Sequence, residues 1–279
     1  MLKAILKHAQ PSALLLAVGI LAVTAASATA ATIHSPSTGN WSVIGTTSSD
    51  TIDQTTTTAT ANDSIIGLGG NDSITVGNGN NVIEADGSCR SGDQDTVTPF
   101  PGNSVYCSIN QISSPHTDTI TAGSGNNLIA GGGYKNTITA GDGTNIVYAG
   151  GASSNSVTVG NGSDLVVGGS GPNTIKAGNG SDLIWAGSSG DTITVGTGSS
   201  FIYAANKKVD HITCAAGNKA TVYADKSDVV KGCKTVIIGG SDPAPPAFGS
   251  PAKASVRLRA AKARYAAKTQ HAKKRHKKH

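Results

Sequence analysis

The chain has 279 residues and a formal net charge of +5, but this sum conceals two regions of opposite charge. All 17 acidic residues and nine of the 22 basic residues lie in 31–252, whereas eleven basic residues lie from Lys253 onward, so the body carries −8 and the tail +11. The four cysteines show no CxxC spacing, which argues against a thiolate metal site. His116 and His211 lie near no nucleophile motif, so we expect neither a catalytic site nor an enzyme.

The N-terminus has the features of a secretory signal peptide. Lys3 and Lys7 precede an apolar run from Ala13 to Val23, and small residues follow as far as Ala30. A membrane-spanning helix needs about 20 apolar residues, and this run is shorter. We therefore expect residues 1–30 to be removed after Ala30 and the protein to be secreted, to an extracellular or cell-wall-associated location.

Residues 31–58 are expected to form a lead-in or cap, and residues 59–240 a solenoid of short repeats. The first units, which include Asp63-Ser-Ile-Ile, are less regular than the later ones. Residues 86–116 interrupt the pattern with three prolines and two cysteines, which is typical of a surface loop. Beyond Ala204 the pattern decays towards about residue 238, as expected of a capping end.

Nine consecutive units, eight of nine residues and one of ten, run from Gly123 to Ala204. A repeat this short cannot bury a hydrophobic face alone, so each unit must stack on its neighbours. The units are GSGNNLIAG, GGYKNTITA, GDGTNIVYA, GGASSNSVTV, GNGSDLVVG, GSGPNTIKA, GNGSDLIWA, GSSGDTITV and GTGSSFIYA.

Each unit predicts one short strand after a glycine-rich turn. Glycine suits the turn because it tolerates positive φ, and the middle residue of the following triplet points inward while its neighbours point outward. The predicted core is Ile120, Ile129, Ile138, Val147, Val157, Val166, Ile175, Ile184, Ile193 and Ile202.

Alternate units differ, so two units form one turn of a two-faced roll. On one face the outward pairs are polar: Thr119/Thr121, Thr137/Thr139, Ser156/Thr158, Thr174/Lys176 and Thr192/Thr194. On the other face they are mostly apolar: Leu128/Ala130, Ile146/Tyr148, Leu165/Val167, Leu183/Trp185 and Phe201/Tyr203. A strand that is apolar on both sides is usually covered on both sides, so we expect the apolar face to be covered by a second chain through self-association or by the 86–116 insertion.

Four cysteines allow three pairings. Two of the cysteines lie within the interruption and two lie near the end of the repeat, so that each pair would close a local segment. We therefore favour disulfides between Cys89 and Cys107 and between Cys214 and Cys233, consistent with an oxidising compartment.

The units GLGGNDSI, VGNGSDLVV, AGNGSDLIW and GGSGPNTIK resemble the repeats-in-toxin (RTX) family, with consensus G-G-x-G-x-D-x-U-x. The resemblance covers about 59–204 clearly and extends weakly to about 238. It implies an all-β parallel β-roll in which Ca²⁺ lies between consecutive turns, held by glycine carbonyls and by the aspartate at position six. Ca²⁺ prefers six to eight oxygen ligands, which two stacked loops can supply.

Within the nine regular units, asparagine replaces aspartate at five of the nine sixth positions, and an amide oxygen brings no charge to a Ca²⁺ site. Asp164 and Asp182 form the one two-carboxylate pair within intact GNGSD turns, backed by glycine carbonyls. The predicted metal ligands are Asp164, Asp182, Gly160, Gly162, Gly178, Gly180, Asp191 and Asn173. The alternative is a ladder in which stacked asparagine amides hydrogen-bond one another and need no metal.

Residues 241–252 are expected to be a proline-rich linker, and residues 253–279 a disordered basic tail. The tail is either a solvated extension or a tether to a polyanion such as cell-wall polymer, anionic lipid or nucleic acid.

The sequence thus predicts a secreted, non-enzymatic protein that binds Ca²⁺ weakly and acts as a structural or adhesive element at the cell surface. The alternative function is a binding module for ice or carbohydrate that uses the threonine ladder or the apolar face without Ca²⁺. Lys176 interrupts the flat threonine array that ice binding would require.

Overall fold

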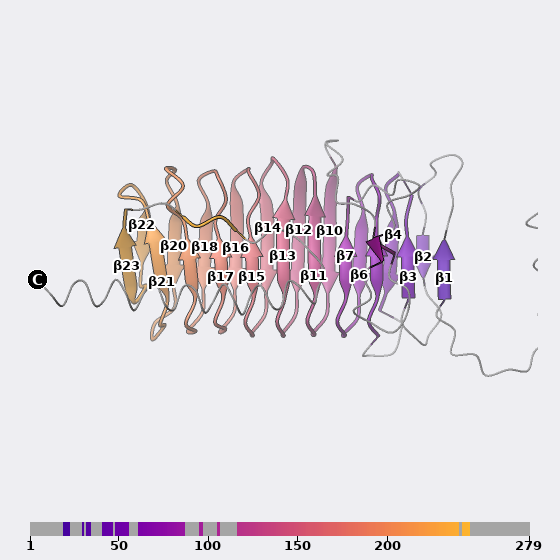
Figure 1. Ribbon diagram of the computed structural model, residues 1–279, viewed down its shortest axis with the longest axis horizontal. Coiled ribbons are helices and arrows are strands. Elements are labelled where there is room, and N and C mark those ends of the chain that lie inside the picture. The colour runs from indigo at the N-terminus through magenta and orange to yellow at the C-terminus, as the bar shows by residue number, and fades with distance from the viewer. Residues whose placement is uncertain are drawn as a thin grey trace, which may run out of the picture.

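A computed structural model describes residues 19–22, 30, 32–34, 41–46, 48–55, 61–86, 95–96, 105–106, 116–239 and 242–245. The fold is all-β, and its strands stack along one axis as two parallel sheets (Figure 1). Strands of the two sheets alternate along the chain, so each solenoid turn contributes one strand to each sheet. The predicted parallel β-solenoid is confirmed.

One sheet, which we call the apolar-face sheet, has eleven strands. They are β1 (Gly19–Ala22), β3 (Trp41–Ile44), β5 (Ser64–Ile66), β7 (Val82–Glu84), β11 (Leu128–Gly132), β13 (Ile146–Gly150), β15 (Leu165–Val167), β17 (Leu183–Trp185), β19 (Phe201–Tyr203), β21 (Thr221–Ala224) and β23 (Thr235–Ile238).

The other sheet, the threonine-face sheet, has ten strands. They are β2 (Thr32–His34), β4 (Thr51–Gln54), β6 (Ser73–Val76), β10 (Thr117–Ala122), β12 (Lys135–Ala140), β14 (Asn155–Val159), β16 (Asn173–Ala177), β18 (Thr192–Val195), β20 (His211–Cys214) and β22 (Val229–Lys231). A separate antiparallel pair joins β8 (Asp95–Thr96) to β9 (Val105–Tyr106) within the 86–116 insertion. None of the described segments is a helix long and apolar enough to span a membrane.

The core is the column of inward side chains that the repeat predicts. Neighbouring strands align these residues directly, as in the pairs Ile129↔Val147 and Ile175↔Ile193. All ten predicted core residues are at most 1% exposed. Burial of one such aliphatic side chain contributes roughly 1.5–3 kcal/mol, so the stack of turns, and not any single unit, supplies the stability.

The two sheets begin upstream of residue 59. Strands β3 and β4 pair in parallel with β5 and β6, in the same registers as later turns. Strand β1 pairs with β3 and lies within the segment that we expect to be removed as a signal peptide. Removal of residues 1–30 would make β3 the terminal strand of the apolar-face sheet.

The outer side of the apolar-face sheet carries a continuous apolar strip. Seven outward side chains of this strip are buried to 5% exposure or less: Val82, Leu128, Ile146, Leu165, Leu183, Trp185 and Tyr203. The rings of Trp185 and Tyr203 stack with centroids 5.0 Å apart, and Tyr203 stacks on Tyr223 at the same spacing. The expectation that this face is covered therefore holds for these side chains.

Residues 242–245, from the predicted linker, supply part of the cover. The indole Nε1 of Trp185 donates a hydrogen bond of 2.8 Å to the carbonyl oxygen of Pro243. Asp242 and Pro243 are half-buried. This segment was not among the covers that the sequence suggested, and most of the 86–116 insertion lies outside the described residues.

The C-terminal turns carry the one disulfide that falls within the described residues, between Cys214 and Cys233. It joins the end of β20 to the loop before β23, as favoured from the sequence. The other predicted pair, Cys89 with Cys107, lies outside the described residues, as does the basic tail 253–279.

Glu84, at the end of β7, is a charged residue within the apolar strip. Its side chain is 2% exposed, and neither carboxyl oxygen has a hydrogen-bond partner among the described residues. Burial raises the pKa of this carboxyl to about 7, because a low-dielectric environment disfavours the ionised form.

The apolar strip predicts a difference between two C-terminal deletions. Deletion of residues 242–279 should expose Trp185, whereas deletion of 253–279 should not, because only the first deletion removes the carbonyl of Pro243. In a Trp41→Phe background, the emission of Trp185 should shift to longer wavelength and become more quenchable by acrylamide only after the longer deletion. Identical spectra for the two truncated chains would contradict this assignment.

Glu84 predicts a pH-dependent loss of stability. Below pH 4.5 the carboxyl is protonated in both the folded and the unfolded state, so its contribution is fully favourable. That contribution is lost as pH rises through about 7, since the folded state must then ionise a buried group, at a cost of about 3 kcal/mol. Glu84→Gln should therefore flatten the decline in the free energy of unfolding between pH 5 and pH 8.5. Urea titrations of both proteins test this, and parallel pH profiles would refute it.

Candidate functional site

In most turns, a polar residue at position six of the repeat lies just before the strand or at its first or second position, and these residues stack into two columns along the solenoid. The apolar-face ladder precedes strands of the apolar-face sheet and comprises Asp63, Asn81, Asn127, Asn145, Asp164, Asp182 and Ser200. The threonine-face ladder lies at the start of strands of the other sheet and comprises Asp50, Asp72, Asp118, Asn136, Asn155, Asn173, Asp191, Asp210 and Asp228. All but Asp228 are buried.

Hydrogen bonds join successive members of each ladder in one direction. Typically the backbone N–H of one member donates to the side-chain oxygen of the member one turn later. Asn127 donates in this way to Asn145 Oδ1 at 3.2 Å, and Asp164 donates to Asp182 Oδ1 at 3.1 Å. One side-chain oxygen of most ladder residues is therefore occupied, whether the residue is asparagine or aspartate.

The glycine turns allow the loops to stack closely. Gly162 has a φ of +151°, and a Cβ on it would lie 1.6 Å from the carbonyl oxygen of Gly143. A Cβ on Gly180 would lie 1.8 Å from the Gly162 carbonyl. Only glycine fits such contacts, so the turns bring rows of backbone carbonyls next to the ladder side chains.

The second side-chain atom of the ladder asparagines faces these carbonyls. Asn127 Nδ2 lies 3.1 Å from Gly123 O and 3.4 Å from Gly125 O, the carbonyls four and two residues before it. It also lies 2.9 Å from Asn145 Oδ1 in the next turn. The amide is a donor, so these contacts are hydrogen bonds.

The second side-chain atom of the ladder aspartates is an acceptor in the same kind of position. A Cβ on Gly67 would lie 2.4 Å both from Asp72 Oδ2 and from the carbonyl oxygen of Ala85. Both oxygens therefore line the space beside Gly67 that a side chain would fill. Five ladder aspartates have an Oδ2 atom that is buried and has no hydrogen-bond partner among the described residues: Asp63, Asp72, Asp118, Asp191 and Asp210. Each of these oxygens requires a proton or a cation as a partner.

Burial raises the pKa of these carboxyl groups, because desolvation disfavours the charge. The pKa of Asp72 rises to about 8, with further contributions from Asp118, Asp50 and Asp86. Desolvation is also the largest cause for the other four carboxyl groups. It raises the pKa to about 6 for Asp63 and to about 7 for Asp118, Asp191 and Asp210.

The structure brings together the ligand pair that the sequence singled out. Asp164 and Asp182 occupy consecutive turns of the apolar-face ladder, and Asn145 N and Nδ2 donate to Asp164 Oδ1 at 2.8 and 3.0 Å. On its far side, Asp182 Oδ2 accepts a 3.1 Å hydrogen bond from Ser200 Oγ. The predicted glycines Gly160, Gly162, Gly178 and Gly180 lie in the same stacked turns.

The other predicted pair, Asn173 and Asp191, also meets, but through amide hydrogen bonds. Asn173 N and Nδ2 donate to Asp191 Oδ1 at 2.6 and 2.9 Å. In the next turn, Asn206 Nδ2 donates to the carbonyls of Gly187 and Ser189 at 3.2 and 3.1 Å. The carbonyls around this pair are thus already bound to amide donors.

Sequence reasoning missed a carboxylate run at the N-terminal end of the threonine-face ladder. Asp50 N donates to Asp72 Oδ1, and Asp72 N donates to Asp118 Oδ1, each at 2.8 Å. The triplet Asp50-Thr-Ile repeats the Asp-Thr-Ile of residues 118–120 and 191–193, which was the available signal. Beside this run, Asp86 Oδ1 lies 3.2 Å from His116 Nδ1.

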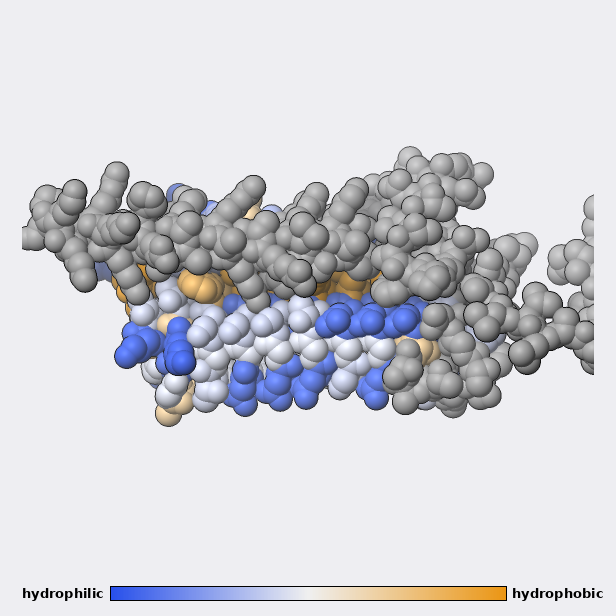
Figure 2. Space-filling view, turned by 60° about the horizontal axis from the view of Figure 1, so that its bottom comes forward, coloured by the Kyte–Doolittle hydropathy of each residue, from blue (hydrophilic) through white to orange (hydrophobic). Residues whose placement is uncertain are grey.

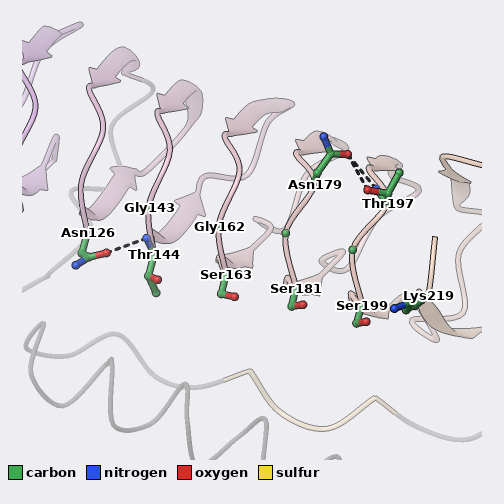
Figure 3. A pocket seen from close by; sticks show the side chains of 12 residues that line it. Asn126, Gly143, Thr144, Gly162, Ser163, Asn179, Ser181, Thr197, Ser199 and Lys219 are labelled. Carbon is green, nitrogen blue, oxygen red and sulfur yellow. Dashed lines mark hydrogen bonds between the residues drawn. The ribbon is translucent and has the colours of Figure 1, made fainter. Parts of the chain in front are cut away.

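Outside the ladders, the turns form an open trough lined by small polar residues (Figure 3). Ser163, Ser181 and Ser199 lie in one row along it, and Lys219 lies at its end. Hydrophilic residues form rows along the length of the solenoid in Figure 2. The hydrogen bonds here run opposite to those of the ladders, as when Thr144 N donates to Asn126 Oδ1 at 2.9 Å.

A cation bound to a ladder must take many of its ligands from the backbone. No three His, Cys, Asp or Glu side chains gather into a metal-binding group within the part of the chain that the structure describes. Ca²⁺ accepts backbone carbonyls as well as carboxylates and needs six to eight oxygens. The stacked carbonyls and the buried Oδ2 atoms that face them fit this ion.

Residues 57–87, 121–154 and 158–193 match the family described as RTX calcium-binding nonapeptide repeat, in four copies. No curated protein and no solved structure matches the chain significantly. The matched segments contain six of the seven apolar-face ladder residues and four of the nine threonine-face ladder residues. Residues 57–193 of the chain therefore carry repeats of the RTX calcium-binding nonapeptide type.

Proposed function

We propose that the protein is a secreted, non-enzymatic solenoid that binds Ca²⁺ at the carboxylate members of its two ladders and serves as a structural or adhesive element at the cell surface. The observation that carries the Ca²⁺ assignment is the row of buried Oδ2 atoms that lack a hydrogen-bond partner among the described residues. Ca²⁺ would supply the positive charge that these oxygens and the adjacent carbonyls lack.

The pair Asp164 and Asp182 is the first proposed site. In the Asn127 turn, the amide donates to the carbonyls four and two residues before it. The equivalent carbonyls before Asp164 are those of Gly160 and Gly162, to which a carboxylate cannot donate. Two carboxylates and these carbonyls would therefore supply oxygen ligands between two intact turns.

The pair Asp72 and Asp118 is the second proposed site. Both side chains are at most 2% exposed, and each has one oxygen without a hydrogen-bond partner among the described residues. The carbonyl of Ala85 lines the same space beside Gly67 as Asp72 Oδ2. Charge repulsion with the neighbouring carboxylates raises the pKa of Asp72 further, so a divalent cation would relieve both desolvation and repulsion.

Replacement of Asp164 by asparagine should remove Ca²⁺ binding at the first site. The wild-type chain should bind Ca²⁺ there with a dissociation constant of roughly 0.1–1 mM, the range of extracellular modules. Asp164→Asn removes one charge and places an amide donor against the carbonyls, so the heat of binding from this site should disappear in calorimetry of the full chain.

Asp142→Asn is the matched control, because Asp142 is an exposed carboxylate in a neighbouring turn whose Oδ1 accepts the backbone N–H of Asn161, at 2.7 Å. This variant loses the same charge and should retain the full heat of Ca²⁺ binding. An absence of any Ca²⁺ heat from the wild-type chain at about 10 mM, on the order of ten times the expected constant, would exclude the proposed function.

Secretion and attachment are supported by sequence features outside the described core. The signal-like residues 1–30 favour export, and the tail 253–279 carries eleven basic residues and no acidic ones. We propose that the tail binds anionic cell-surface polymers or other polyanions, since the body has the opposite charge and would be repelled by them.

Deletion of 253–279 should abolish retention on anionic polymer, and salt should release the intact protein, because charge attraction is screened beyond about 8 Å at physiological ionic strength. Co-sedimentation of both chains with anionic vesicles or cell-wall polymer at two salt concentrations measures this. Retention of the truncated chain equal to that of the intact chain, or retention insensitive to salt, would assign attachment to the solenoid instead.

A further inference from the structure

We propose that the asparagine amides of the two ladders occupy the cation positions of the solenoid, so that its central turns are held together without Ca²⁺. The sites proposed above for Ca²⁺ would then be confined to the carboxylate runs outside this centre. Only that second statement rests on the proposed function. The first concerns the wild-type amide contacts and can be tested in the complete absence of Ca²⁺.

The apolar-face ladder shows the replacement in three successive turns. Asn81 Nδ2 lies 3.2 Å from Gly77 O, 3.5 Å from Gly79 O and 2.9 Å from Asn127 Oδ1. Asn127 repeats this set of oxygens, and Asn145 Nδ2 lies 2.9 Å from Gly141 O and 3.0 Å from Asp164 Oδ1. Each nitrogen thus bridges a glycine turn to the ladder oxygen of the next turn.

The threonine-face ladder repeats the arrangement and provides its most complete example. Asn173 Nδ2 is surrounded by four oxygens: Gly169 O at 3.3 Å, Gly171 O at 2.8 Å, Ala186 O at 3.0 Å and Asp191 Oδ1 at 2.9 Å. Four oxygens from two turns around one atom resemble part of the coordination shell of a cation such as Ca²⁺, which takes six to eight oxygens. Here a neutral nitrogen with two hydrogens lies at its centre.

The hydrogen bonds of the ladder determine which amide atom faces the carbonyls. Asn127 Oδ1 accepts from both N and Nδ2 of Asn81, at 3.2 and 2.9 Å. Only an oxygen can accept the backbone N–H, so the other amide atom must be the nitrogen. That nitrogen is the atom turned towards the turn's carbonyls, where it is a donor among acceptors.

A residue outside the ladders provides an independent instance. Asp191 belongs to a carboxylate run, and the carbonyls four and two residues before it are those of Gly187 and Ser189. Asn206 reaches this pair of carbonyls from the next turn with its Nδ2. An amide nitrogen is therefore found at this position even where the ladder residue itself cannot supply one.

Together the amide members form one central block. On the apolar-face ladder they run from Asn81 to Asn145, and on the threonine-face ladder from Asn136 to Asn173. Each run ends by donating to a carboxylate, Asp164 on one side and Asp191 on the other. Carboxylates continue from there towards the C-terminus, and on both ladders they also precede the block.

The decisive comparison is between two adjacent asparagines in the full chain. Asn127→Asp places an acceptor against the carbonyls of Gly123 and Gly125, whereas Asn126→Asp introduces the same charge at an exposed side chain whose oxygen accepts from Thr144 in either form. In EDTA, Asn127→Asp should lower the melting temperature by roughly 5 °C or more, and millimolar Ca²⁺ should recover most of this loss. Asn126→Asp should match the wild type in both conditions.

Hydrogen exchange of the wild-type chain provides the second measurement, which does not depend on any variant folding. Backbone amides in turns 123–147 should be equally protected in EDTA and in Ca²⁺. Loss of their protection in EDTA would overturn the proposal, as would an Asn127→Asp variant that is as stable in EDTA as Asn126→Asp, or one whose loss Ca²⁺ does not recover. If the wild type binds no Ca²⁺ but these turns stay protected, the proposed function fails and this inference stands.

Discussion

The position-six side chain is the interaction on which this solenoid depends, because its two terminal atoms face different partners. One atom accepts the backbone N–H of the preceding turn and joins the turns whatever the residue type. The other atom faces backbone carbonyls that the glycine turns bring close. An amide satisfies those carbonyls with hydrogen bonds, whereas a carboxylate adds one more acceptor to them. The choice between asparagine and aspartate at one position therefore decides whether a turn needs a cation.

The rest of the architecture follows from this constraint. Glycine at the turn positions is required because a Cβ on Gly162 would overlap the carbonyl of Gly143. Close stacking of the turns aligns the inward isoleucines and valines into one core column. Burial that stabilises this column also desolvates the ladder, which is why the pKa values of Asp72 and Asp118 rise to about 8 and about 7. Hydrophobic stability and demand for a cation thus have a common origin.

Much of the fold could be predicted from the repeat, because its period places equivalent residues in columns. The inward core, both faces and the meeting of Asp164 with Asp182 all follow from that period, whereas the pairing of Cys214 with Cys233 was predicted because the two cysteines close a local segment. The early turns were harder to predict, because 22 residues separate Asp50 from Asp72 and 46 separate Asp72 from Asp118, whereas 18 residues separate Asp164 from Asp182. The contact of Pro243 with Trp185 has no sequence signal, because a backbone carbonyl is the group that binds. Which amide atom faces the carbonyls also required the hydrogen-bond pattern.

The ladder continues undisturbed across the 86–116 interruption. Asn81 and Asn127 are 46 residues apart, yet Nδ2 and Oδ1 lie 2.9 Å apart, as they do between Asn127 and Asn145, which are 18 residues apart. The hydrogen bonds of the ladder therefore do not depend on the number of residues between two turns, provided that the chain leaves and returns at the same edge. The connection between two such turns can therefore accept an inserted segment of different length or composition while both sheets keep their register.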